Sequence, residues 1–173
     1  VRVVARPGHF ILANTPIAYV HDEGERDEAR RIDEGVLHAA ILLADARAAD
    51  GDILFNVHLS VEIALRALSP GINDPYTAIS AIDQLSASLA MILQRGAPSS
   101  LVCDGDEKPR VWLELIEVGE IVGTALHPLR RVASGNVMVT LRLIEAVGRM
   151  ALVTRSEHAH TLKTHLRLIA TDA

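Results

Sequence analysis

The stretch "VEIALRALSPGINDPYTAISAIDQL", residues 61 to 85, decides the fold. Apolar residues at helical spacing stand on both sides of a short polar segment, which predicts two helices joined by a turn. Asp74 followed by Pro75 has the form of an N-cap with proline at the first helical position. The stretch therefore predicts a pair of consecutive helices, and it raises the question whether their joint is also a binding site.

Further helices are predicted on both sides of this stretch. The first helix of the pair begins at Ile53, after Asp52 as its N-cap, and ends at Leu68, while the second extends to Arg95. The buried edge of this second helix is predicted to be Ile79, Ile82, Leu85, Leu89 and Ile92. Upstream, a helix is expected from about Arg30 to Ala48, with Ile32, Val36, Ala39, Ala40 and Leu43 on one face.

Three helices are predicted in the last third of the chain, at about 116–133, 136–153 and 157–170. "SGN" at 134–136 separates the first two, and Thr154 and Glu157 have capping-box spacing before the third. Gly119 and Gly123 make a G-x-x-x-G spacing that favours close helix packing. The three helices complete a bundle with the pair described above.

Two hairpins are predicted outside the helices. In residues 1–21, "VRVVA" alternates, "RPGH" forms a turn, "FILA" is the second strand, and "NTP" leads into "IAYV". Gly8 and Asn14 are the residues best able to take positive φ there. The second hairpin, 99–115, surrounds a polar turn at 104–109, and together the hairpins are expected to form one small sheet.

Composition sets the fold class. Hydrophobic residues make up 49% of the 173 residues but aromatic ones only 3%, which suits packed helices better than a sheet sandwich. The expected class is α+β and mostly α: about six helices, in 30–95 and 116–172, with two short hairpins. We expect one domain over residues 1–173.

Charge and cysteine content exclude several classes of function. The net charge of -5 gives no basic field for a nucleic acid backbone. Cys103 is alone, so the chain has no internal disulfide, and it is expected in a reducing compartment as a small core residue. No apolar run is expected to be long enough to span a membrane, because the longest candidate, 84–94, is too short. The mixed-charge run 21–35 is predicted to be a solvated loop and a first helical turn.

The candidate site is a polar stripe on the first helix of the pair. At about 100° per residue, His58, Glu62, Arg66 and Ser69 fall within about 80° and lead to the joint. A helix N-terminus attracts anions, so a small anionic ligand could be held by Arg66 and the backbone near Tyr76. The alternative, which we favour, is a buried or interfacial ion-pair network in which Glu62 pairs with Arg66. The ligand-binding candidates are His58, Glu62, Arg66, Asn73, Asp74 and Tyr76.

Enzymatic and metal-binding motifs are missing from the sequence. It contains no nucleophile elbow, P-loop, dinucleotide glycine fingerprint or zinc-protease helix motif, so no cofactor and no catalytic residue is assigned. Of the eight histidines, His58 with Glu62 has i,i+4 spacing for one ion, but no third ligand follows from the sequence. His158 and His165 are predicted on the apolar side of the last helix, and His160 on another side.

Three segments resemble one family, the bacterial predicted membrane proteins catalogued as domain of unknown function 2254. Residues 61–85 resemble its central motif closely, "ARPGHFILANTPIAYV" at 5–20 an upstream element, and 131–151 its C-terminal helices more loosely. His9, Asn14, His58 and Glu62 depart from the family pattern, although Asn14 keeps the turn chemistry and Glu62 the charge. The resemblance implies several transmembrane helices in an N-terminal part, a soluble C-terminal part and no established activity.

The chain is accordingly expected to be a fragment, the soluble part of an inner membrane protein, on the cytoplasmic side. Our leading hypothesis is a non-enzymatic domain for oligomerisation, regulation or ligand sensing. Its expected partners are further copies of itself and its own transmembrane part, with a small anionic ligand as a further candidate. The alternatives are an enzyme or metal-binding domain with its site at the polar stripe, or a gating domain of a channel or transporter.

Overall fold

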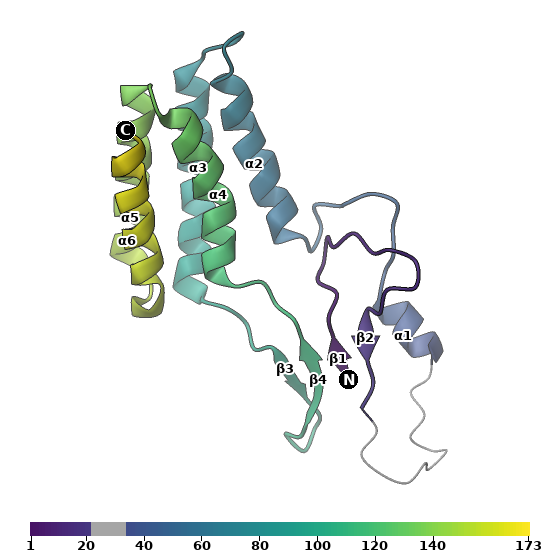
Figure 1. Ribbon diagram of the computed structural model, residues 1–173. Coiled ribbons are helices and arrows are strands. Elements are labelled where there is room, and N and C mark those ends of the chain that lie inside the picture. Colours follow the sequence, from purple (N-terminus) through teal and green to yellow (C-terminus); the bar gives the residue numbers. More distant parts are fainter. Residues whose placement is uncertain (22–33) are drawn as a thin grey trace. The chain divides into compact units, whose positions relative to one another are not determined.

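The computed structural model describes residues 1–21 and 34–173 (Figure 1). The chain forms two compact units. The sheet unit comprises Val1–Ala48 and Ser100–Glu114, and the helical unit comprises Ala49–Ser99 and Leu115–Ala173. The predicted class, mostly helical with a small sheet, is confirmed.

Five helices of at least 14 residues make up the helical unit. They are α2 (Ile53–Ala67), α3 (Pro75–Arg95), α4 (Val118–Ala133), α5 (Val137–Val153) and α6 (Ala159–Asp172), with the 3₁₀-helix η2 (Ser156–His158) before α6. Asp52 caps α2 as predicted, because its carboxylate accepts a 2.9 Å hydrogen bond from the Phe55 N–H. Asn136 caps α5 by accepting from the Val139 N–H. The predicted helices after residue 52 are therefore confirmed to within about two residues at most ends.

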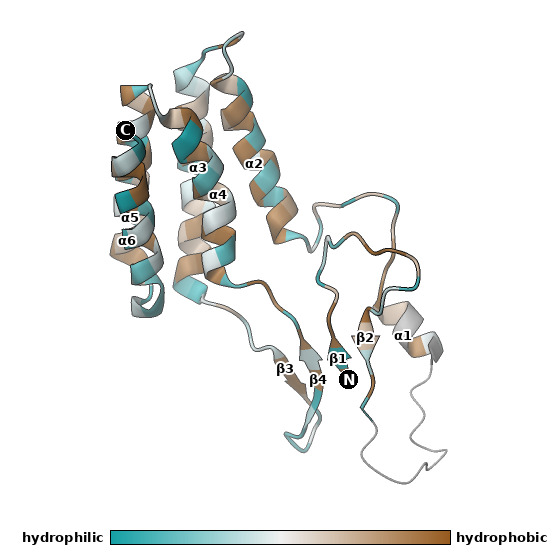
Figure 2. Cartoon of the chain, in the orientation of Figure 1, coloured by the Kyte–Doolittle hydropathy of each residue, from teal (hydrophilic) through white to brown (hydrophobic). Residues whose placement is uncertain are grey.

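The core of the helical unit is aliphatic, as the composition predicts. Helix α3 packs against α2 and α5, while α4 packs against α2 and α6 (Figure 1). Brown apolar positions and teal polar ones are mixed along α2 and α4, as expected of helices with one buried side (Figure 2). In α3 the buried residues are Ala78, Ala81, Ile82, Leu85, Leu89 and Leu93, whereas Ile79 and Ile92 pack against this core while partly exposed.

The sheet unit contains one mixed sheet of four short strands. They are β1 (Arg2–Val3), β2 (Ala18–Tyr19), β3 (Leu101–Cys103) and β4 (Pro109–Leu113), in the order β2-β1-β4-β3. Strand β1 pairs antiparallel with β2 and parallel with β4, so the two predicted hairpins do join. Gly8 and Asn14 have φ angles of 80° and 65°, as their turn chemistry predicts.

Two predictions for the sheet unit are wrong. "FILA" is not a strand: the partner of β1 is β2, further along the chain, and Phe10 is 90% exposed. The helix expected over 30–48 is the shorter α1 (Glu34–Ala40), and Leu42 and Leu43 beyond it are 92% and 67% exposed. A short helix depends on a packed apolar face, and the exposed leucines supply none. Ile32 and most of the mixed-charge run lie outside the described residues.

Two smaller predictions are also corrected. Thr154 follows the end of α5, and its hydroxyl donates to the Arg155 carbonyl, while Glu157 pairs with Arg155 and His158. No capping box forms there, because the turn between the helices is taken up by η2. Cys103 is exposed on β3 and is not a core residue.

Helix α3 also corrects the expectation that no segment is long enough to span a membrane. Among the described residues it is the one helix that is long and apolar enough, by length and composition alone. In the structure 33% of that apolar stretch is buried, and the core helix of a soluble protein passes the same test.

Candidate functional site

The predicted polar stripe lies on the exposed face of α2. His58, Glu62 and Arg66 are all exposed. Arg66 Nη2 lies 2.6 Å from Glu62 Oε1, and the two side chains are 74% and 51% exposed. The i,i+4 ion pair is thus present, but on the surface and not in a buried network within this chain. An exposed pair of this kind stabilises a protein by about 0–1 kcal/mol.

The joint between α2 and α3 is closed by its own hydrogen bonds. Asp74 Oδ1 accepts from the Tyr76 and Thr77 N–H groups at 3.1 Å each, and its Oδ2 accepts from the Thr77 hydroxyl at 2.6 Å. These bonds, first those from Thr77 and then that from Tyr76, hold the pKa of Asp74 below its usual value. Since the Asp74 carboxylate occupies the N-terminus of α3, an added anion would have to displace it.

The six ligand-binding candidates therefore do not share one set of contacts. Glu62 bonds Arg66, and Asp74 bonds the backbone of Tyr76, whereas Asn73 has a left-handed backbone with φ of 46°. Tyr76 is 72% exposed and faces a groove toward α5. The anionic ligand stays a prediction, and the observed bonds favour the structural reading of the joint.

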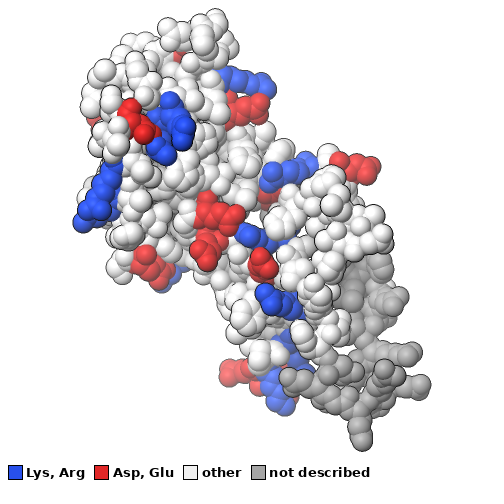
Figure 3. All heavy atoms as spheres, viewed as in Figure 1, with Lys and Arg blue, Asp and Glu red and all other residues white. Residues whose placement is uncertain are grey.

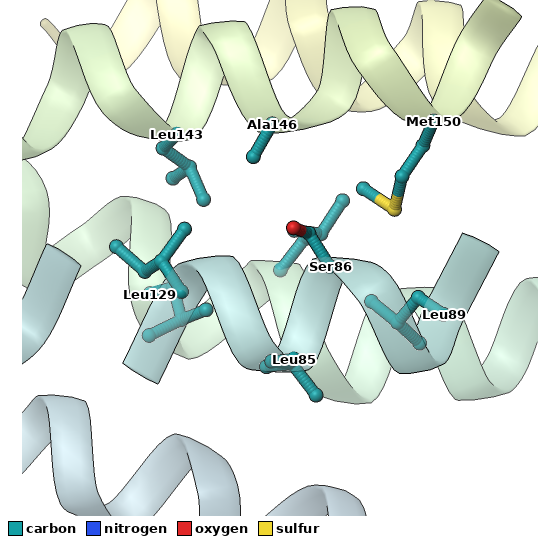
Figure 4. Close-up of a pocket in the computed structure, with 9 residues that line it drawn as sticks. Leu85, Ser86, Leu89, Leu129, Leu143, Ala146 and Met150 are labelled. Atoms are coloured by element: carbon teal, nitrogen blue, oxygen red, sulfur yellow. The ribbon is translucent and has the colours of Figure 1, made fainter. Parts of the chain in front are cut away.

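A small core cavity and an open groove lie in the helical unit. The first is a cavity of about 10 Å³ in the core between α3, α4 and α5 (Figure 4). Its lining is apolar except for Ser86, whose hydroxyl donates to the Asp83 carbonyl, so it holds one water at most. The second is an open groove of about 370 Å³ between α3 and α5, lined by Tyr76, Ile79, Met138, Leu141, Arg142 and Glu145.

A four-residue ion cluster beside this groove was missed in the sequence. Asp83 on α3 accepts from Arg142 at 2.6 Å and from Arg149 at 3.1 Å, both on α5, and Arg142 also bonds Glu145 at 3.1 Å. The bonds to Asp83 and then Glu145 raise the pKa of Arg142. The partners lie 59 and 66 residues apart, so no local spacing signals them. The cluster connects α3 to α5 by ion pairs. Two of its charged residues, Arg142 and Glu145, line the groove.

The largest feature that sequence reasoning missed is an apolar surface on α5. At about 100° per residue, its apolar members fall within about 140° on the side away from the core, and Ile144 and the 61% exposed Glu145 lie within the same arc, Glu145 toward one edge. We call this set the α5 face: Val137, Met138, Leu141, Gly148, Ala151 and Leu152. Val137, Leu141 and Leu152 are 74%, 55% and 86% exposed. Charged side chains are also sparse over much of the surface of the helical unit that is visible in Figure 3.

Histidines form a pair and no metal centre in the described part of the chain. His165 on α6 is 4% exposed, and its ring centroid lies 4.8 Å from that of His127 on α4. Burial, then His127 and Arg130, lower the pKa of His165 to about 4, so it is neutral at pH 7. No group of three or more His, Cys, Asp or Glu able to hold a metal occurs among residues 1–21 and 34–173. The predicted apolar-side placement of His165 is confirmed.

The glycine spacing on α4 is not explained by contact with another helix. A Cβ built on Gly119 would lie 3.9 Å from the Thr161 hydroxyl oxygen of α6, an ordinary van der Waals distance. A Cβ on the buried Gly123 would meet the His127 ring of α4 itself at 3.4 Å. The role of this spacing in close helix packing therefore stays a prediction.

Comparisons with known proteins agree with the resemblance in the sequence. Uncharacterized proteins of Mycobacterium tuberculosis and Mycobacterium bovis are each 32% identical over 105 residues, which cover 61% of this chain and 20% of the relative. The match thus spans about a fifth of the length of these curated relatives. No solved structure matches. A family model described as "Predicted membrane protein (DUF2254)" matches residues 1–149, and the chain therefore belongs to this family of predicted membrane proteins.

Proposed function

We propose that this chain is a non-enzymatic domain through which a membrane protein of this family forms homo-oligomers. The observation that carries the proposal is the α5 face, an apolar surface on one helix with its most exposed leucine, Leu152, 86% exposed. Contiguous exposed apolar surface on a soluble unit marks an interaction site. The proposal makes the stretch 131–151, which contains most of α5, the assembling part of the domain.

The energetics favour burial of this face. Transfer of a leucine side chain from water to a packed interface is worth about 1.5–3 kcal/mol. The same face is present on every copy of the chain, so two copies can bury it against each other in a closed symmetric interface. Association of identical faces is closed, because each copy uses its one α5 face and presents no second α5 face for further growth.

The arrangement of polar groups supports a non-enzymatic role. The groove between α3 and α5 is open, and its two charged residues, Arg142 and Glu145, bond each other. Arg142 is held further by Asp83. Charges that are paired in this way stabilise the contact between α3 and α5 and are not free to act as acid or base.

The test is the mass of the chain in solution. We expect light scattering to give a defined oligomer for the wild type, and Leu141→Asp and Leu152→Asp to weaken it by about 30-fold or more, because each buries a carboxylate in an apolar interface. Ile63→Asp is the matched control, since Ile63 is 53% exposed on α2, away from the α5 face. Circular dichroism of all variants checks that the helices remain. A monomeric wild type, or an oligomer that both α5 variants leave intact, contradicts the proposal.

We also propose that the domain lies on the cytoplasmic side of the membrane. The support is Cys103, an exposed free thiol, because such thiols persist in reducing compartments. In intact cells that produce the membrane protein containing this chain, a membrane-impermeant maleimide is expected to leave Cys103 unlabelled until the membrane is permeabilised. Cys103→Ser gives the background. Labelling of Cys103 in intact cells would place the domain outside.

A further inference from the structure

We infer that the assembly is a twofold pairing of α5 with α5 of a second copy, antiparallel, with the axis beside Ile144 and Glu145. The inference rests on the proposed function and adds the partner surface and its register. It follows from how the residues of the α5 face are spaced along the helix.

The spacing of the α5 face is symmetric about the level between Ile144 and Glu145. Val137 and Leu152 are equally far from that level, as are Leu141 and Gly148, and Met138 and Ala151. In an antiparallel pair, the two members of each set lie at the same level on the two copies. Leu141 and Gly148 are both near the middle of the arc and therefore face each other, whereas Val137 and Leu152, and Met138 and Ala151, lie toward opposite edges of the interface. The central set thus joins a large side chain with a small one, which is how close-packed helix interfaces interdigitate.

Gly148 is the position that this pairing explains. It lies inside α5, where glycine costs about 1 kcal/mol relative to alanine. A Cβ built on it would meet no atom within 4 Å, so packing inside the chain does not require glycine. Opposite Leu141 of a second copy, the missing side chain makes room for the leucine. In a parallel pair in register, Gly148 would instead face Gly148 and leave a gap.

The groove between α3 and α5 provides a place for the most exposed leucine. In the antiparallel register, Leu152 of the second copy lies at the level of Val137 and Met138. Met138 lines that groove together with Tyr76 and Ile79, and Tyr76 is 72% exposed. The second copy thus covers apolar surface of α3 as well as α5, and the surroundings of Leu152 change from water to the end of the groove that Tyr76, Ile79 and Met138 line.

Charge on the edge of the α5 face agrees with a second copy as the occupant. Arg142 and Glu145 bond at 3.1 Å, and their side chains are 32% and 61% exposed. The twofold axis beside Glu145 brings the two Glu145 side chains to within about 1.5 Å of the same level, and Arg142 of each copy lies about 3 Å along the axis from Glu145 of the other and offsets their like charge. The resulting cluster has two positive and two negative groups from this edge, so its charge is balanced.

Disulfide trapping tests the register. In a Cys103→Ser background, one chain carries Leu141→Cys and a second carries Gly148→Cys. A disulfide needs Cα atoms within about 7 Å, which the antiparallel register gives to the mixed pair. We expect oxidation to link the mixture and to leave each chain unlinked by itself. Ile63→Cys mixed with Gly148→Cys is the control for random collision.

Replacing Gly148 with leucine gives a second, independent test of the antiparallel register. Gly148→Leu adds apolar surface and a better helix former, so the free chain is expected to fold at least as well. The antiparallel register predicts that it nevertheless weakens the oligomer by roughly tenfold or more, because it overpacks against Leu141.

The outcomes separate the register from the proposed function. If light scattering finds an oligomer but Leu141→Cys links to itself, or Gly148→Leu strengthens association, the antiparallel register is overturned and homo-oligomerisation stands. If the wild type is monomeric, both the antiparallel register and the proposed homo-oligomerisation are overturned.

Discussion

Truncating Leu89 to alanine is expected to lower the free energy of unfolding by about 2–5 kcal/mol. Leu89 is 1% exposed in the middle of α3 and lines the core cavity beside Leu85 and Met150 (Figure 4). The truncation removes apolar burial and enlarges a void that already exists, so the surrounding side chains lose contacts on one side. Urea unfolding followed by circular dichroism, at one fixed protein concentration, measures the change.

Met91→Ala is the matched control for this prediction. Met91 stands two residues along the same helix but is 54% exposed, so its truncation creates no cavity. We expect it to change the free energy of unfolding by less than about 1 kcal/mol. Equal losses for the two variants would mean that α3 is not packed as the structure has it, and that the apolar stretch of α3 needs another explanation, such as insertion into a membrane.

The sequence predicts the central helices well because their ends are fixed by local chemistry. Asp52 and the Asp74–Pro75 pair are cap signals that act within one helical turn, and both caps form. The expected helix over 75–95 is α3 itself. The Glu62–Arg66 pair was predictable for the same reason, since i,i+4 neighbours on a helix meet without help from the rest of the fold.

Local sequence patterns do not predict structure correctly where the structure of a segment depends on a partner that is distant in the sequence. "FILA" has the composition of a strand, yet β1 pairs with β2 and β4, so its neighbours come from residues 18–19 and 109–113. The Asp83 cluster and the His127–His165 pair likewise join helices that are far apart in sequence. No spacing rule connects such residues before the bundle is known.

The α5 face depends partly on local sequence and partly on partners that are distant in the sequence. The sequence shows that α5 is apolar on several sides, but which side the bundle covers is set by the packing of α3 and α6. Once α3 and α6 have buried Leu143 and Val147, the side with Leu141 and Leu152 remains exposed. An apolar surface of this kind becomes a candidate interface through the packing of the other helices.

The second large effect is a loss of stability in mild acid that depends on His165. Its folded-state pKa is about 4, against 6.5 for the unfolded chain, because the ring is buried and faces His127 and Arg130 of α4. Between these values the unfolded chain binds the additional proton, so the stability is complete above about pH 6.5 and falls as the pH decreases toward 4. The difference between the folded and unfolded pKa values corresponds to a loss of at most about 3 kcal/mol in the free energy of unfolding.

His165→Gln is expected to remove this part of the pH dependence. Chemical unfolding at one protein concentration gives the free energy of unfolding of the wild type and the variant at pH 7 and pH 4.5. The loss of stability between the two pH values is then compared between the two proteins. The contribution of the carboxylates cancels in this comparison, because both proteins contain them. The ion pair of Arg130 with Asp172 stays in both proteins, so the positive charge facing position 165 is unchanged. His160→Gln is the control, because His160 is exposed on the same helix and should leave the wild-type pH dependence intact. If His165→Gln loses as much stability in acid as the wild type, the buried imidazole is not the group whose protonation opposes folding.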